Sequence, residues 1–223
     1  RYEHIEQGRK LMSKGGPFKM RGLQLGKSVT DQERVHHLKS LVDSFDDMAE
    51  LTGLPASMMG YNGKLAMAVG ARGVAGALAH YEPTANAINL TRLNGAGSLA
   101  HEWGHFFDSN AGAADLNGGR NRDNNLTGSR VPRGASQGPP SPTREAVTAL
   151  RDSEAFRKFD ARITTAMDKN PLYSPPEKQY WRSHVEMFAR SFERHLQRKM
   201  AKQGRSNTYL VALRKAASSP DGL

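Results

Sequence analysis

The five residues from His101 to His105, with the sequence His-Glu-Trp-Gly-His, constrain the fold more than any other feature of this chain. Two histidines four positions apart project side by side if the segment is an α-helix, which turns about 100° per residue. The same face carries Asp108. The opposite face is apolar and consists of Leu99, Trp103 and Phe106. The pattern therefore predicts an amphipathic helix with an apolar back and a chemically active front.

This spacing also predicts a metal site. Neutral imidazoles at positions i and i+4 of a helix can bind one ion, and the intervening Glu102 lies near that ion without binding it. From there its carboxylate can take a proton from a metal-activated water molecule. The chain has no cysteine, so the remaining ligands must be His, Glu or Asp. We therefore expect Zn²⁺ on His101 and His105, with Glu102 as the general base.

Further segments accompany the motif: Gly70-Ala71-Arg72-Gly73, Ala79-His80-Tyr81-Glu82-Pro83, Ile88-Asn89-Leu90-Thr91, and the run from Gly95 to His105. Together they resemble the zincin-type metallopeptidase domains of large polyvalent proteins of phages and conjugative elements, and more loosely the gluzincin group. The resemblance is dense from about Leu54 to Asp108 and returns around Glu186–Arg190. It implies a zinc-dependent peptidase fold in which a glutamate is the third metal ligand, and it implies little about the substrate.

A helix expected from about Glu177 to Met200 carries the candidates for this third ligand. Its predicted buried stripe consists of Trp181, Val185, Phe188, Phe192 and Leu196. Glu186 and Glu193 are seven residues apart and share one flank, so periodicity leaves either possible. The resemblance favours Glu186, because its Glu-x-Phe-Ala pattern matches the ligand-bearing segment of the family. His184, on the apolar side of the same helix, is a further candidate.

Besides the ligands and the general base, such a site needs an outer-shell partner for a ligand histidine and a donor for the oxyanion. Asp108 follows His105 by three residues, which suits an outer-shell carboxylate that accepts a ring N–H and holds a ligand histidine in one tautomer. Hydrolysis of a peptide bond also needs a donor for the oxyanion of the tetrahedral intermediate. The candidates for that donor are His184, Tyr180 and Arg190, and the sequence does not choose among them.

The expected fold class is α+β, a minimal zincin-like fold. A capping box at Thr30–Glu33 begins a long helix that ends at Gly53. Short strands are expected at residues 64–69, 78–81 and 88–91, forming a small mixed sheet packed on the helix of the motif. In the resembled peptidases an edge strand lies beside the cleft, where a substrate peptide can add as a further strand. His80 and Tyr81 would then lie near the cleft.

The second half is expected to be mainly helical, with helices after Ser141, Ser153 and Ser206 in addition to that at residues 177–200. Three regions are expected: a basic, solvated N-terminal arm at 1–29, a single zincin-like domain at 30–217, and a tail at 218–223. Gly, Asn, Arg, Ser and Pro dominate residues 109–141, which predicts a long flexible loop there. The chain begins with Arg1 rather than methionine, which suggests a domain of a longer polypeptide.

The formal net charge of +10 predicts attraction to nucleic acid or to an acidic partner. The other expected partner is a protein or peptide substrate. No apolar run approaches membrane-spanning length and no signal peptide opens the chain, so we expect a cytoplasmic or virion-associated domain without a membrane partner. The expected function is that of a zinc metalloendopeptidase. The alternatives are a nucleic-acid-associated or virion module that keeps a zincin fold with little proteolysis, and an interaction module in which zinc serves folding alone.

Overall fold

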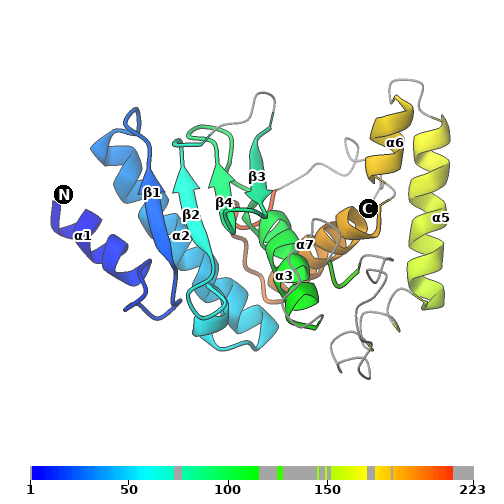
Figure 1. The fold of residues 1–223 in the computed structure, drawn as a ribbon, viewed down its shortest axis with the longest axis horizontal. Coiled ribbons are helices and arrows are strands. Elements are labelled where there is room, and N and C mark those ends of the chain that lie inside the picture. The colour runs from blue at the N-terminus through cyan, green and yellow to red at the C-terminus, as the bar shows by residue number, and fades with distance from the viewer. Residues whose placement is uncertain are drawn as a thin grey trace. The chain divides into compact units, whose positions relative to one another are not determined.

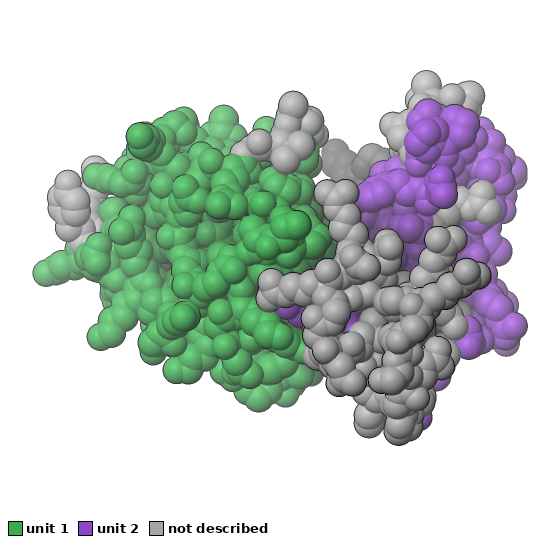
Figure 2. All heavy atoms as spheres, viewed as in Figure 1, with its two compact units in different colours: residues 1–106, 192–213 green, residues 107–191, 214–223 purple. Residues whose placement is uncertain are grey.

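The computed structural model describes residues 2–72, 77–115, 125–127, 145, 149, 152–169, 174–181 and 183–212. Over these residues the chain has the expected α+β architecture, with a small mixed sheet and a mainly helical second half (Figure 1). It divides into two compact units, residues 1–106 with 192–213 and residues 107–191 with 214–223 (Figure 2). Two of the three boundaries fall inside continuous helices, α3 (Leu99–Asp115) and α7 (His184–Lys202).

The first unit is built on a four-stranded sheet in the order β1-β2-β4-β3. The strands are β1 (Gly22–Leu25), β2 (Ala66–Val69), β3 (Ala79–Glu82) and β4 (Ala87–Leu90). β1, β2 and β4 are parallel, and β3 pairs antiparallel with β4 at the edge. The three strands predicted from the sequence are therefore confirmed, and β1 is a fourth that the sequence did not predict.

The two inner strands are more deeply buried than an alternating pattern suggests. All four residues of β4 are buried, including Asn89, and so are the last three of β2. Strands covered on both faces lose the alternation that marks a strand with one wet face. The edge strand β3, by contrast, is half-buried throughout.

The long helix α2 (Asp31–Thr52) begins and ends where the sequence predicts. The backbone N–H of Glu33 donates to the side chain of Thr30, and the backbone N–H of Thr30 donates to the Glu33 carboxylate at 2.8 Å, so the capping box is complete. Gly53 ends the helix in the left-handed conformation with φ 72°. A short 3-10 helix, η1 (Ala56–Met58), follows.

The N-terminal segment differs from the solvated arm that the sequence suggested. It forms α1 (Tyr2–Leu11) and β1, and its apolar side chains belong to the core, namely Ile5, Met12, Phe18 and Met20. α1 packs closely on α2 at Gly8, where a Cβ atom would lie only 2.9 Å from Leu38 Cβ. The buried residues stand singly among basic ones, so their spacing gives no clear periodic signal.

The second unit contains α5 (Glu154–Lys169), α6 (Pro175–Trp181) and the first turns of α7. Ser153 caps α5 as predicted, since its hydroxyl accepts a hydrogen bond from the Phe156 N–H at 3.1 Å. The single helix expected at residues 177–200 is instead two helices, α6 and α7. Ser183 begins α7, where its hydroxyl accepts a hydrogen bond from the Glu186 N–H at 3.3 Å.

Part of the predicted loop is helical, because α3 continues through residues 109–115. Most of the remaining loop, the helix predicted after Ser141 and the tail at 218–223 lie outside the described residues, apart from residues 125–127 and single helical positions at 145 and 149. No final helix begins at Ser206, since residues 208–210 form a turn. Of the helices that the structure describes, none is long and apolar enough to span a membrane.

His37 of α2 makes the stability of the first unit dependent on pH. Its Nδ1 lies 2.9 Å from the hydroxyl of Tyr209, and burial, followed by the charge of His36, lowers the pKa of His37. The folded state then binds this proton less tightly than the unfolded state. The resulting stability is present above the unfolded pKa of about 6.5 and is lost as the pH falls through the folded pKa.

We therefore expect the free energy of unfolding of metal-free protein to decrease between about pH 7.5 and about pH 5.5 less steeply in His37→Gln than in the wild type. The difference in slope should be at most about 1.4 kcal/mol per pH unit, the limit for one proton. Urea denaturation followed by circular dichroism measures it, with His4→Gln, an exposed histidine, as the control. Equal slopes for the wild type and His37→Gln would contradict the assignment.

Candidate metal centre

The first turn of α3 is fixed by the chain segment at residues 207–212. The N–H of Ala100 donates to the Leu210 carbonyl at 3.0 Å, and the N–H of Gly97 donates to the Tyr209 carbonyl at 2.8 Å. The first amides of a helix have no partner within it, and the Leu210 carbonyl satisfies that of Ala100, while the Tyr209 carbonyl holds Gly97 just before the helix. Gly97 has φ 86°, and a Cβ atom there would lie 2.9 Å from the Cα of Ala212. The histidine-bearing helix therefore begins at a position set by the C-terminal part of the chain.

The predicted apolar back of α3 is confirmed. Trp103 is 1% exposed, donates from Nε1 to the Met59 carbonyl at 2.8 Å, and stacks on Phe192 of α7 with centroids 5.2 Å apart. Phe106 is fully buried, with edge contacts to Tyr61 and Tyr81. These contacts fix the rotation of α3 about its axis, and with it the direction of the opposite face, which carries the histidines.

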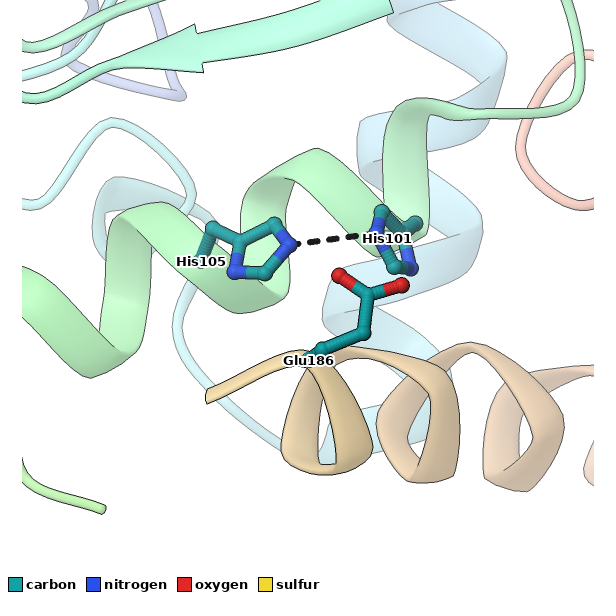
Figure 3. A group of neighbouring side chains, drawn as sticks. All are labelled: His101, His105 and Glu186. Carbon is teal, nitrogen blue, oxygen red and sulfur yellow. Dashed lines mark hydrogen bonds between the residues drawn. The ribbon is translucent and has the colours of Figure 1, made fainter. Parts of the chain in front are cut away.

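The two histidines of α3 direct the same ring atom toward one point. Their Nε2 atoms lie 3.1 Å apart, and the rings are nearly perpendicular at 86° (Figure 3). Two nitrogens bound tetrahedrally to one zinc ion at 2.0–2.1 Å would be about 3.3 Å apart. The observed spacing of His101 and His105 therefore fits two ligands of a single ion, as well as a hydrogen bond between the rings.

Glu186 of α7 completes a group of three. One possible ligand atom from each of His101, His105 and Glu186 lies within 4.8 Å of the other two, and Figure 3 shows the three side chains pointing toward one another. Two imidazoles and a carboxylate form a donor set of the kind that binds catalytic zinc. The structure thus brings together the three residues that the sequence predicted as ligands.

The carboxylate of Glu186 is 1% exposed, so it needs compensation for the water it has lost. Arg190, one turn later, supplies this compensation, with Nε 2.6 Å from Glu186 Oε1. The Arg190 guanidinium in turn lies over the ring of Trp181, 3.6 Å from its centroid. Arg190 was expected only as a candidate oxyanion donor, although its i, i+4 spacing from Glu186 is a sequence signal for this ion pair.

The buried face of α7 differs from the predicted stripe. Val185, Phe188 and Phe192 are only half-buried, whereas the buried residues are Glu186, Met187, Ala189, Arg190, Glu193, Leu196 and Met200. The helix is therefore turned toward the flank that carries both glutamates. A hydrophobic pattern cannot predict this, because ion pairing makes burial of the polar residues possible.

The other candidate site residues lie outside the group of three. Glu102 is 7% exposed and follows His101 on α3. Glu193 lies on the other side of the His101 ring, with Oε2 3.9 Å from Nδ1, and is not one of the three grouped residues. At the start of α7, His184 is half-buried and lies 6.3 Å from the Phe156 ring, while Tyr180 on α6 is 54% exposed.

Asp108 is fully buried and binds Thr127. Oδ1 accepts the Thr127 N–H at 2.8 Å and Oδ2 accepts its hydroxyl at 2.5 Å, while the Asp108 carbonyl accepts the N–H of Leu126. The carboxylate therefore anchors residues 125–127 to α3. Its predicted action on a ligand histidine stays a prediction. His80 interacts with Asn89 at 3.1 Å, within the sheet.

Comparison with known proteins identifies one segment of the chain. Residues 172–222 match the family described as large polyvalent protein-associated domain 1. The match covers less than half of the chain and includes α6, α7 and the segment that caps α3. It supports an association with large polyvalent proteins of phages and mobile elements. Searches of the curated proteins and of the solved structures found no match.

The matched segment depends on the rest of the chain for its partners. Lys199 donates to the Leu51 carbonyl, and Arg205 pairs with Asp47 and Glu50 of α2. Two carbonyls of the segment accept hydrogen bonds from amides at and just before the start of α3. We therefore expect residues 172–223 expressed alone to be largely unfolded, and to gain helical circular dichroism when mixed with residues 1–171. A cooperative thermal transition of the isolated segment at room temperature or above would contradict this expectation.

Proposed function

We propose that this chain is a zinc-dependent metallopeptidase and a domain of a larger phage or mobile-element protein. The observation that carries the proposal is the grouping of His101, His105 and Glu186, with the Nε2 atoms of the two histidines 3.1 Å apart. Glu102 follows His101 directly on the same helix. Three protein ligands leave a further position open, which is typical of catalytic rather than structural zinc. The match to the polyvalent-protein family supports the wider context.

When bound, zinc would supply Lewis-acid chemistry, by polarising the scissile carbonyl and making water more acidic. The protein residues would do the rest. Glu102 is placed by the same helix turn as His101, so its carboxylate would accept the proton of the attacking water. It would then pass that proton to the leaving amine. Glu186, oriented by Arg190, would bind the metal through its carboxylate.

The position of strand β3 at the edge of the sheet is an argument for a peptide substrate. Among the described strands β3 pairs with β4 alone, and Tyr81 of β3 contacts Phe106 of the metal-binding helix. A peptide in extended conformation can add to such an edge through main-chain hydrogen bonds. We infer that the substrate chain lies along β3 with its scissile bond toward His101 and His105.

Of the three candidate donors for the oxyanion, Arg190 is the least suitable. Arg190 already pairs with Glu186 at 2.6 Å and stacks on Trp181, so moving it to the substrate would break a buried ion pair. Tyr180 and His184 stay the candidates.

The proposed mechanism predicts different results for the base and for a ligand. Glu102→Gln should retain about one zinc per chain and lose peptidase activity at least about 100-fold, because it removes the proton acceptor. His101→Ala should lose the metal itself. Zinc content by mass spectrometry and digestion of a peptide library measure both, with the exposed Glu154→Gln as the matched control. Full casein cleavage or self-cleavage by Glu102→Gln would contradict the mechanism.

The identity of the third ligand is a separate prediction. Glu186→Ala should weaken zinc binding strongly, because it removes a donor atom from the group of three. A chelator competition titration measures the affinity. If Glu186→Ala bound zinc as tightly as the wild type while Glu193→Ala did not, Glu193 would be the ligand instead.

A further inference from the structure

Glu193 is buried in the first unit and has no role in the proposed reaction. It is 7% exposed, and its Oε2 lies 3.9 Å from Nδ1 of His101, itself half-buried. A carboxylate removed from water beside an imidazole is a partner for that ring, because each compensates the other for lost hydration.

The two ring nitrogens of His101 face different neighbours. Nε2 lies 3.1 Å from His105 Nε2, the atom pair that fits one zinc ion. Nδ1 must then carry the ring proton, because a ligand imidazole is neutral. The Glu193 carboxylate is on this Nδ1 side. A metal-binding histidine almost always donates its other N–H to a carboxylate, a carbonyl or water, which fixes both the tautomer and the ring orientation.

The packing of α7 keeps Glu193 in this place. Its neighbour Phe192 stacks on Trp103, two residues after His101, with ring centroids 5.2 Å apart. Two helical turns separate Glu193 from Glu186, so one flank of α7 presents two carboxylates to the histidine helix. Asp108, the outer-shell acid that the sequence suggested, uses both carboxylate oxygens to bind Thr127.

We propose that Glu193 is the positioning residue of the metal centre: it accepts the Nδ1 proton of His101 and thereby directs Nε2 toward the ion, without binding the ion itself. This inference rests on the proposed zinc site. It assigns different tasks to the two glutamates of α7, Glu186 to the metal and Glu193 to the ligand histidine.

The test compares zinc affinity in the wild type, Glu193→Gln, Glu186→Ala and the exposed control Glu154→Gln. We expect Glu193→Gln to bind zinc about 10- to 100-fold more weakly than the wild type, since outer-shell partners have effects of this size. The absorption spectrum of the cobalt-substituted variant should keep the wild-type band positions, because the set of ligands is unchanged. Glu154→Gln should match the wild type in both measurements.

Three results would overturn the inference. The first is a zinc affinity of Glu193→Gln within about threefold of the wild type. The second is a cobalt spectrum of Glu193→Gln changed in the same way as that of Glu186→Ala, which would make Glu193 a ligand. The third needs no variant: in zinc-loaded wild type, the Nδ1–H of His101 should give a downfield, slowly exchanging NMR signal, and its absence would exclude the hydrogen bond. A wild type that binds no zinc would instead contradict the proposed function itself.

Discussion

The packing of α7 against α3 at Trp103 and Phe192 is the contact on which the candidate site depends. Their rings stack at 5.2 Å with an interplanar angle of 27°, and Trp103 is tied to the Met59 carbonyl. Trp103 lies between the two histidines in sequence, and Phe192 lies next to Glu193. Together with the contacts of Phe106, this contact therefore orients α3, and it places the residue next to Glu193 against the histidine helix.

The segment matched to the polyvalent-protein family contributes more than one part of this arrangement. It provides Glu186, Arg190 and Glu193 from α7. Its Leu210 carbonyl caps the helix that carries the histidines, and its Tyr209 carbonyl holds Gly97 just before that helix. The motif helix and the family segment therefore depend on each other: one holds the imidazoles, and the other positions that helix and supplies the carboxylates.

Sequence signals correctly predicted those helix ends and helix faces that depend on residues close together in the chain. The capping box at Thr30 and the glycine at position 53 bound α2, and the face of Trp103 and Phe106 could be read from helical spacing. The choice of Glu186 over Glu193 came from the family resemblance, because both lie on one flank. The burial of that flank could not be predicted, since it depends on the ion pair of Glu186 with Arg190 and on contacts with another helix. The binding of Asp108 to Thr127 joins residues across a segment without a periodic pattern, so no sequence signal indicated it.

The claim that one zinc ion is held by His101, His105 and Glu186 is tested most directly by anomalous X-ray diffraction at the zinc edge, from crystals of the zinc-loaded protein. The account predicts one strong anomalous peak per chain, within bonding distance of Nε2 of both histidines and of the Glu186 carboxylate, with Glu193 beyond bonding distance. A peak coordinated by other residues, or no peak at these three side chains at full zinc loading, would contradict it.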